Sequence, residues 1–550
     1  MPALAFSRLS LVCCAFAALS LASASAQPAP PPDFSGGEGG WVHSLNATFL
    51  PVEGSPSPVM QDPGHPFKGA AWRIGDLSNP NLKPWVKDVM KKDNDEIDHG
   101  KIAFQARSSC VPSGIPNMFL PGNPLLVIQG PKEVMMIKQG GQEVRHIYLN
   151  VPHSGSVKPS WYGESVGHYE GDTLVVDTIG QNTKTVVDAF RTPHTGKLHV
   201  VERWHLIDGG KTLEANITVD DPDTFNRPWS TYVRHERGTE LPYLEDICAE
   251  NNLHLFDYHM PVAEKAGFLR RPQMVRLAYL LTAGAICGAG LWMAQGAGAA
   301  EATPGLSASD YGWFPVSDDF QPPLSGPGPV VSDPAHPYYS NQSGRQPTDR
   351  VADLNNPILQ PWVVERLRKS NAATLAGKIP YSPRETCRPA GVPGFDVFSR
   401  LRPIYFLQTP REVTIINEGD QQSRRVYLNV PHSKNPKPSW YGESVGHYEG
   451  GELVVDTIGL NDKTNVDNYL TPHTTQLHVV ERYKMAADGK SLELSITVDD
   501  PGAFTAVWGA RQTYRRMPQE KMQEAVCAEN NVDFFAQGYF PVPQAEKADF

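Results

Sequence analysis

The sequence predicts a mainly β protein made of two tandem antiparallel meander or barrel-like (calycin-like) domains with a few short helices. Three observations lead to this prediction. The fourteen letters KPSWYGESVGHYEG occur twice, at residues 158–171 and 437–450. Around each copy, alternating apolar and polar residues are separated by glycine-containing turns, as in successive β-hairpins. The 47 glycines and 50 prolines also favour turn-rich β structure over a helical bundle.

The duplication extends well beyond this block. A constant offset of 279 residues takes His153 to His432 and Cys248 to Cys527 without a gap. Each copy is longer than roughly 200 residues, which is enough to bury a core of its own. We therefore predict one β-rich domain over residues 27–265 and a second over 301–550. The two copies could also pair with each other as a pseudo-dimer.

Two segments resemble export signals. Residues 1–26 combine Arg8, an apolar run and the small residues ASA, which predicts a signal peptide and a periplasmic or secreted protein. The linker 266–300 repeats this pattern, with three arginines before an uncharged run over 277–294. This run is either a transmembrane anchor in the inner membrane or the remnant signal of two fused secreted proteins. The arginines lie on the side of the exported first domain, which favours the fusion.

Composition and motifs exclude several classes of function. The net charge is −11 and there is no basic stripe, which argues against a nucleic-acid partner. The sequence contains no convincing dinucleotide fingerprint, P-loop or GxSxG motif. No HExxH or CxxC pattern appears, and the histidine spacings are loose. We therefore expect no cofactor and no metal, and a small molecule as the partner.

Four of the seven cysteines lie outside the signal-like segments, two in each copy. Cys110 and Cys248 belong to the first copy, and Cys387 and Cys527 to the second. Export to an oxidising compartment predicts one disulfide per domain, and free buried thiols are the alternative.

The elements of one copy follow in order. A helix is expected at 81–92, matched by 356–369 in the second copy, and a strand at 125–130. Three hairpins follow, and a short helix ends the copy. The expected hairpin strands are 133–139 with 142–150, 164–170 with 173–180, and 198–208 with 211–221, and the final helix is 243–251.

The register of the third hairpin places a carboxylate on the core face. A two-residue turn opposes Glu202 to Ile217, among apolar neighbours, and the second copy repeats this with Glu481. A buried carboxylate needs a partner, or its pKa rises. Glu202 is therefore either a structural acid, paired with an arginine such as Arg145, or a general acid or base.

The second hairpin is the repeated block. Its turn opposes His168 to Val175, so Glu164, His168 and Asp177 share one face. A histidine beside carboxylates suits acid–base chemistry, because imidazole titrates near neutral pH and an acid orients it. A hydrogen-bonded structural network is the alternative. The second copy provides the equivalent residues Glu443, His447 and Asp456.

Further candidates flank this hairpin. The aromatic pair Trp161 and Tyr162 could form a wall for a planar or apolar ligand, or could be core residues. His153 and His194 are additional candidates for ligand contacts, whereas His199 is expected to form a surface pair with Asp220. The corresponding residues of the second copy are Trp440, Tyr441, His432 and His473.

Taken in order, the motifs CVPSGIP, RHIYLN, NVPHS, SWYGESVGHYEGDTLVVDTIG, PHTGKLHVVERW, ITVDDP and CAENN resemble those of a family of uncharacterised secreted bacterial proteins. The resemblance covers most of both copies. It implies export and one β domain per copy, and it implies no particular activity. In that family a more basic or neutral residue is common at the positions of Glu164 and Glu443, so a role for these glutamates would be particular to this chain.

These observations lead to one functional hypothesis and two alternatives. The leading hypothesis is an exported, cofactor-independent acid–base enzyme (a lyase, isomerase, cyclase or hydrolase) acting on a small apolar or aromatic molecule. His168 and His447 would transfer the proton in a concave pocket walled by tryptophan. The alternatives are a lipocalin-like carrier without catalysis and an interaction module of the cell envelope.

Overall fold

The computed structural model describes residues 31–247 and 303–527, with internal gaps. These gaps are 37–39, 44–47, 67–72, 100–110, 121–123, 139–142, 239–246, 308–310, 339–349, 377–382, 384–386, 398–401, 420–421, 519–521 and 523. The predicted signal peptide and the linker 266–300 lie outside the described residues, as do Cys110, Cys248 and most of the expected helix 243–251. Within the described residues, no helix is long and apolar enough to cross a membrane.

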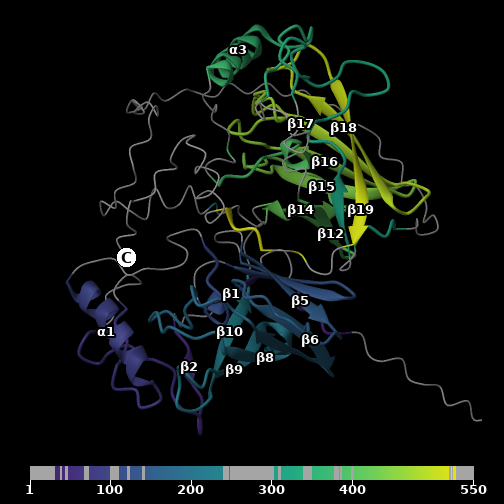
Figure 1. Cartoon of the computed structure of the whole chain (residues 1–550). Helices are drawn as coiled ribbons and strands as arrows, with labels where there is room; N and C mark the ends of the chain where they lie inside the picture. Colours follow the sequence, from purple (N-terminus) through teal and green to yellow (C-terminus); the bar gives the residue numbers. More distant parts are fainter. Residues whose placement is uncertain are drawn as a thin grey trace, which may run out of the picture.

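The first repeat folds into a closed β-barrel (Figure 1), in which β1 pairs with both β3 and β10. A short strand, β2, adds to β10. The strands are β1 (Trp41–His43), β2 (Leu50–Pro51), β3 (Leu125–Gln129), β4 (Glu133–Lys138), β5 (Glu143–Leu149), β6 (Glu164–Glu170), β7 (Thr173–Ile179), β8 (His199–Ile207), β9 (Thr212–Asp220) and β10 (Trp229–Arg237).

The second repeat forms an equivalent closed barrel, with β11 pairing with β12 and β19. Its strands are β11 (Tyr311–Pro315), β12 (Ile404–Gln408), β13 (Glu412–Asn417), β14 (Gln422–Leu428), β15 (Glu443–Glu449), β16 (Glu452–Ile458), β17 (His478–Met485), β18 (Ser491–Asp499) and β19 (Trp508–Pro518). The predicted fold class of two tandem barrel-like β domains with few helices is confirmed.

The expected antiparallel meander is wrong at one place in each barrel. β5 and β6 run parallel, as do β14 and β15, whereas the other neighbouring strands are antiparallel. Parallel neighbours need a connection that returns along the sheet, which takes about a dozen residues. Residues 150–163 supply this crossover, and they begin with Asn150 in the left-handed region (φ 58°).

The predicted hairpin registers are confirmed. His168 lies opposite Val175 and Val166 opposite Asp177 in the β6–β7 hairpin, and Glu202 lies opposite Ile217 in the β8–β9 hairpin. Gly171, in the turn between β6 and β7, has a φ of 63°, which glycine adopts at little cost. The local pattern therefore fixed which side chains share a face.

One helix accompanies each barrel, α1 (Pro84–Asp98) and α3 (Pro361–Leu375). Both begin with proline, whose fixed φ suits the first helical turn. On α1 the side chains of Val86 and Met90 pack into the first core. The amide of Asn94 bonds both backbone groups of Gly75, at 3.0 and 2.8 Å. The predicted helix ranges began a few residues too early and ended a few too soon.

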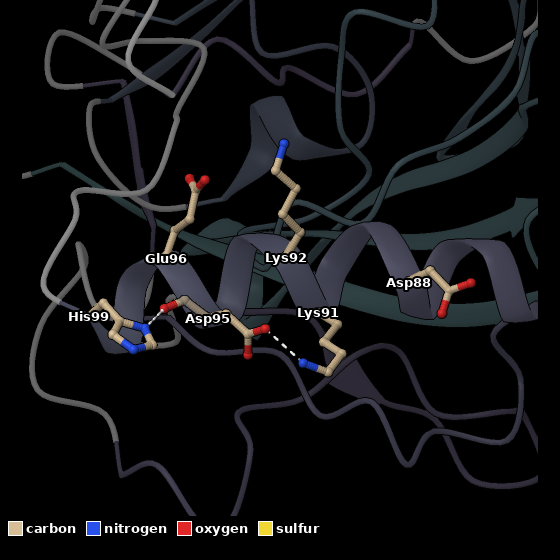
Figure 2. Close-up of a pocket in the computed structure, with 6 residues that line it drawn as sticks. All are labelled: Asp88, Lys91, Lys92, Asp95, Glu96 and His99. Atoms are coloured by element: carbon tan, nitrogen blue, oxygen red, sulfur yellow. Dashed lines mark hydrogen bonds and ion pairs between the residues drawn. The ribbon is translucent and has the colours of Figure 1, made fainter.

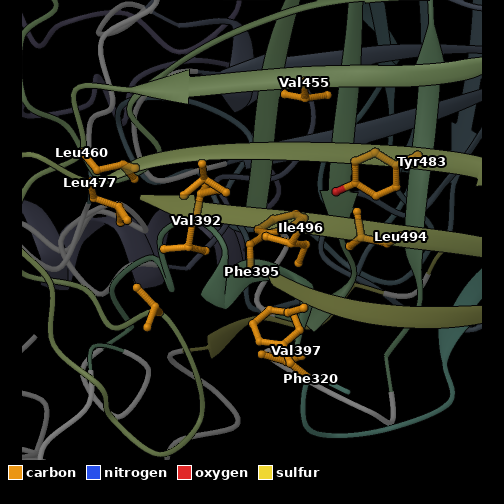
Figure 3. Packing of buried hydrophobic residues seen from close by; sticks show 14 of the residues in the cluster. Phe320, Val392, Phe395, Val397, Val455, Leu460, Leu477, Tyr483, Leu494 and Ile496 are labelled. Atoms are coloured by element: carbon orange, nitrogen blue, oxygen red, sulfur yellow. The ribbon is translucent and has the colours of Figure 1, made fainter. Parts of the chain in front are cut away.

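Packed side chains fill both barrels. In the first, Trp41, Trp204 and Trp229 are almost completely buried, and in the second Trp313 and Trp508 are. Figure 3 shows part of the second core, where Phe395, Tyr483 and Ile496 lie among aliphatic side chains. This interior is a core of the kind that fills small closed barrels.

Three features complete the comparison with the sequence. β1, β2, β10, β11 and β19 were not predicted, although β10 alternates buried and exposed residues along its length. The disulfide Cys387–Cys527 is confirmed, with a Cα–Cα distance of 5.7 Å. The other expected disulfide involves cysteines outside the described residues.

Candidate functional site

An ion pair lies at the centre of each barrel. The guanidinium of Arg145 donates to both oxygens of Glu202, at 2.9 and 2.7 Å, and both side chains are fully buried. It also donates to Thr178 at 2.8 Å, and the indole of Trp204 donates to Glu202 at 2.8 Å. The second barrel repeats the pair with Arg424 and Glu481. Glu202 and Glu481 are thus satisfied interior acids, as the structural interpretation expected, and they do not join a solvent-accessible site.

The residues around this pair differ between the barrels. In the first barrel the ring of Phe119 lies 5.6 Å from the guanidinium carbon of Arg145. In the second, Asp396 occupies the corresponding place and accepts hydrogen bonds from Tyr483 (2.9 Å) and Tyr514 (3.2 Å). The two interiors have therefore diverged, while the central ion pair is present in both.

The hairpin face that carries His168 is the outer face of the barrel. His168 has 52% of its side chain exposed and contacts Glu170 at 3.1 Å. The expected cluster of His168 with Glu164 and Asp177 is wrong, because a different histidine lies between these two carboxylates. His447 is likewise exposed. The structure therefore places these two histidines on an exposed surface and not in the expected concave pocket.

His153 is the histidine that lies between the two acids. Its Nδ1 is 3.1 Å from Glu164 and its Nε2 is 2.9 Å from Asp177. The Nε2 of His199 lies 3.1 Å from both oxygens of Asp177. The backbone N–H of Ser154 donates to Glu164 at 2.6 Å. Glu164, His153, Asp177 and His199 thus form one hydrogen-bonded chain, which we call the outer His–acid chain.

The second barrel reproduces this chain. The Nδ1 of His432 is 3.0 Å from Glu443, its Nε2 is 2.9 Å from Asp456, and the Nε2 of His478 is 3.0 Å from Asp456. The backbone N–H of Ser433 donates to Glu443 at 2.6 Å. Matching distances therefore agree within 0.1 Å between the repeats.

The crossover 150–163 explains how the chain forms. It returns His153 to the start of β6, where Glu164 follows the crossover directly, and β7 presents Asp177 beside it. His199 begins β8, the next strand of the sheet. His199 faces Asp220 in the strand register, yet its hydrogen bonds go to Asp177, so the expected surface pair with Asp220 is corrected.

Hydrogen bonding dominates the electrostatics of the chain. Partial burial acts to raise the pKa of Asp177, but the hydrogen bonds from His153 and His199 outweigh it and hold the pKa below its usual value. For Glu443, burial is likewise outweighed by hydrogen bonds from Ser433 and His432, and its pKa is lowered. Asp177 and Glu443 are therefore ionised at neutral pH and act as acceptors.

The other predicted ligand contacts are core residues. Trp161 is 5% exposed, and the ammonium of Lys184 lies 5.6 Å from its ring. The hydroxyl of Tyr162 donates to the buried Glu143 at 2.8 Å. The ring of His194 bonds Thr185 and a backbone carbonyl, and burial lowers its pKa. Their equivalents Trp440, Tyr441 and His473 are buried in the same way.

The part of the chain that the structure describes offers no second candidate site of this kind. Among the described residues, no group of three or more His, Cys, Asp or Glu side chains could hold a metal ion. A pocket beside α1 is lined by charged side chains that project in different directions (Figure 2), and Lys91 and Asp95 already pair at 2.7 Å. The second repeat has Ala372 and Ala376 where this lining has Asp95 and His99, so the pocket is not shared. Its lining residues are Asp88, Lys91, Lys92, Asp95, Glu96 and His99.

Sequence reasoning underestimated His199, His478, Ser154 and Ser433. The motif NVPHS, present in both copies just before a segment long enough to cross the sheet, could have identified Ser154 and Ser433, and the motif LHVVER, also present in both copies, contains His199 and His478. The sequence matches no protein-family model and no curated protein. The function is therefore argued from the outer His–acid chain.

Proposed function

We propose that the chain is an exported acid–base enzyme with two equivalent sites, one on the outside of each barrel. The outer His–acid chain forms each site, and His199 or His478 transfers the proton. The class of reaction is a lyase, isomerase, cyclase or hydrolase that needs no cofactor. His168 and His447 have no part in this proposal.

One observation supports the proposal most strongly. The outer chain has the same residues and distances in both repeats, although buried positions such as Phe119 and Asp396 have diverged. His199 is 41% exposed, and exposed positions ordinarily tolerate substitution. Retention of an exposed network through this divergence is expected if the network acts on something outside the protein.

The hydrogen bonds assign a role to each member. The carboxylate of Asp177 only accepts, so the Nε2–H of His153 donates to it, while Nδ1 of His153 contacts Glu164. His153 therefore positions Asp177. The Nε2–H of His199 donates to Asp177, and its Nδ1 has no partner among the described residues. Nδ1 is thus the atom that accepts a proton from the substrate, and Asp177 stabilises the resulting imidazolium.

The surroundings favour a small, partly apolar substrate bound outside the barrel. Val151 lies two residues before His153 and Val430 two residues before His432, and these valines are 46% and 48% exposed. Inside the barrels, tryptophan and aliphatic side chains already fill the space where a carrier would hold its ligand. This packing favours the enzyme hypothesis over the lipocalin-like alternative.

A double substitution tests the proposal. His199→Ala with His478→Ala removes both proton acceptors from half-exposed positions, and should therefore abolish turnover while moving the melting temperature by only a few degrees. A strain carrying this variant should accumulate the same exported metabolites as a deletion strain, as measured by untargeted profiling.

The matched control is His168→Ala with His447→Ala, because these histidines belong to the same repeated block but are not members of the outer His–acid chain. The control should give the wild-type profile. A wild-type profile from the His199/His478 variant, or loss of folding in place of loss of turnover, would contradict the proposal and assign the network to stabilising the crossover.

A further inference from the structure

The end of the second repeat contacts the first repeat. The carboxylate of Glu524 accepts hydrogen bonds from the backbone N–H groups of Trp161 and Tyr162, the latter at 3.0 Å. The hydroxyl of Ser160 donates to it at 3.2 Å. Three donors of one turn in the first repeat are thus satisfied by a side chain about 360 residues away in the sequence.

Apolar contacts accompany this carboxylate. The side chain of Val526 is 7% exposed and packs into the hydrophobic core of the first barrel. Met522 packs against a cluster to which both barrels contribute. The members of that cluster are Leu126, Ile128, Met135, Ile137 and Val144 from the first barrel and Tyr405, Leu407 and Ile416 from the second.

The segment is also tied to its own barrel. Cys527 follows Val526 directly and forms the disulfide with Cys387, which precedes β12 in the second repeat. One short piece of chain is therefore covalently fixed to the second repeat, while its side chains enter the first. Figure 1 shows the last coloured part of the chain, in yellow, running between the two barrels.

We propose that residues 522–527 are a docking element that joins the two barrels into one unit, with the turn 160–162 of the first repeat as its receptor. A buried backbone N–H without an acceptor is costly, so the turn gains stability from the incoming carboxylate. Tyr148, Tyr162 and His146 also face Glu524. The interaction is independent of the acid–base activity proposed above.

Hydrogen–deuterium exchange of the full-length protein tests the docking. Glu524→Ala removes the acceptor of two amides, so the amides of Trp161 and Tyr162 should exchange at least tenfold faster. Glu524→Gln, which keeps one acceptor oxygen, should give an intermediate rate. The control Glu493→Ala changes an exposed carboxylate of the same barrel and should leave these amides unaffected. Unchanged exchange in Glu524→Ala would overturn the proposal.

A second measurement covers the case in which Glu524→Ala fails to fold. A protease site is placed between residues 266 and 300, and the full chain is cut there after folding. The two fragments should co-elute on size-exclusion chromatography, whereas fragments of a chain that ends at residue 518, after β19, should separate. Separation of the wild-type fragments, or co-elution of the shortened ones, would overturn the docking.

Discussion

At the scale of single residues, the central ion pairs show how a buried charge is tolerated. Arg145 donates hydrogen bonds to Glu202, Ser165 and Thr178, so that no charge in this network is left without a partner. The desolvation cost of such a pair is large, and it is offset only when the hydrogen-bond geometry satisfies both partners. Removing one partner should therefore be much more damaging than removing an exposed ion pair.

This comparison gives the first prediction. Arg145→Ala should lower the free energy of unfolding by about 3–5 kcal/mol, because it leaves the Glu202 carboxylate buried without its counter-ion. Arg203→Ala is the matched control, since Arg203 pairs with Glu170 on the exposed outer face and its loss should destabilise the protein far less. Urea denaturation measures both. Equal losses from the two substitutions would show that the buried pair is not the main source of stability.

Asp396 distinguishes the second interior from the first. Burial, reinforced by the neighbouring charge of Glu481, raises the pKa of Asp396 well above its ordinary value. A carboxyl whose pKa is raised on folding stabilises the protein below its unfolded pKa, and this stability is lost as the pH rises towards the folded value. The second barrel should thus weaken with increasing pH for a reason that the first barrel, with Phe119 in this place, does not share.

The second prediction follows from this linkage. Asp396→Asn cannot ionise, so its melting temperature should match the wild type below pH 3.8, the ordinary value of this carboxyl, and exceed it near pH 8. Glu493→Gln, an exposed position of the same barrel, should show the wild-type pH dependence. Scanning calorimetry at several pH values measures the difference, and parallel profiles for wild type and Asp396→Asn would contradict the assignment.

At the scale of elements, the crossover 150–163 decides the geometry of the site. Gly163 ends it with a φ of 67°, and a Cβ atom there would clash with the carbonyl oxygen of Ile179. Gly442 has the same conformation and the same close neighbour, Ile458, in the second repeat. Only glycine allows β6 to start this close to the end of β7, which is where Glu164 meets His153 and Asp177.

The third prediction compares two glycines with similar φ. Gly171→Ala, at an open hairpin turn, should lower the free energy of unfolding by about 1 kcal/mol, because alanine is strained in the left-handed region. Gly163→Ala adds the clash and should cost roughly 2–4 kcal/mol. Denaturant unfolding of each variant checks the order. A smaller loss at Gly163 than at Gly171 would show that the crossover relaxes freely.

At the level of the complete chain, the two barrels meet in a shared apolar cluster and through the segment that carries Glu524. Burial raises the pKa of Glu524 to about 7, although hydrogen bonds from Tyr162, Trp161 and Ser160 oppose this shift. Docking should therefore be favoured in acid and weaken as the pH rises from about 4.5 towards 7 and above.

The fourth prediction concerns this pH dependence. In the chain cut between the barrels, the fraction of co-eluting fragments should increase between pH 8 and pH 5.5. His146 also faces Glu524, so Glu524→Gln is the necessary comparison, and it should flatten the curve. A curve that keeps its slope in Glu524→Gln would assign the dependence to His146 and its partner Glu133 instead.

The duplication, the hairpin registers and the sharing of a strand face by particular side chains could all be predicted from the sequence. These features depend on local periodicity: a two-residue alternation assigned Glu202 to the core, and the need of a buried carboxylate for a partner suggested an arginine such as Arg145 as one of two alternatives. The same alternation correctly placed Glu164, His168 and Asp177 on one face, but it could not say that this face is the outside of a closed barrel.

The pairing of His153 with the two acids and the contact between the repeats depend on how the complete barrels fold and could not be predicted from the sequence. His153 reaches Asp177 because the crossover returns along the sheet and makes β5 and β6 parallel, a choice that depends on the closure of the whole barrel. Glu524 reaches the turn at Trp161 across more than half of the chain. Contacts between distant segments leave no periodic trace in the sequence, because they depend on how complete elements pack.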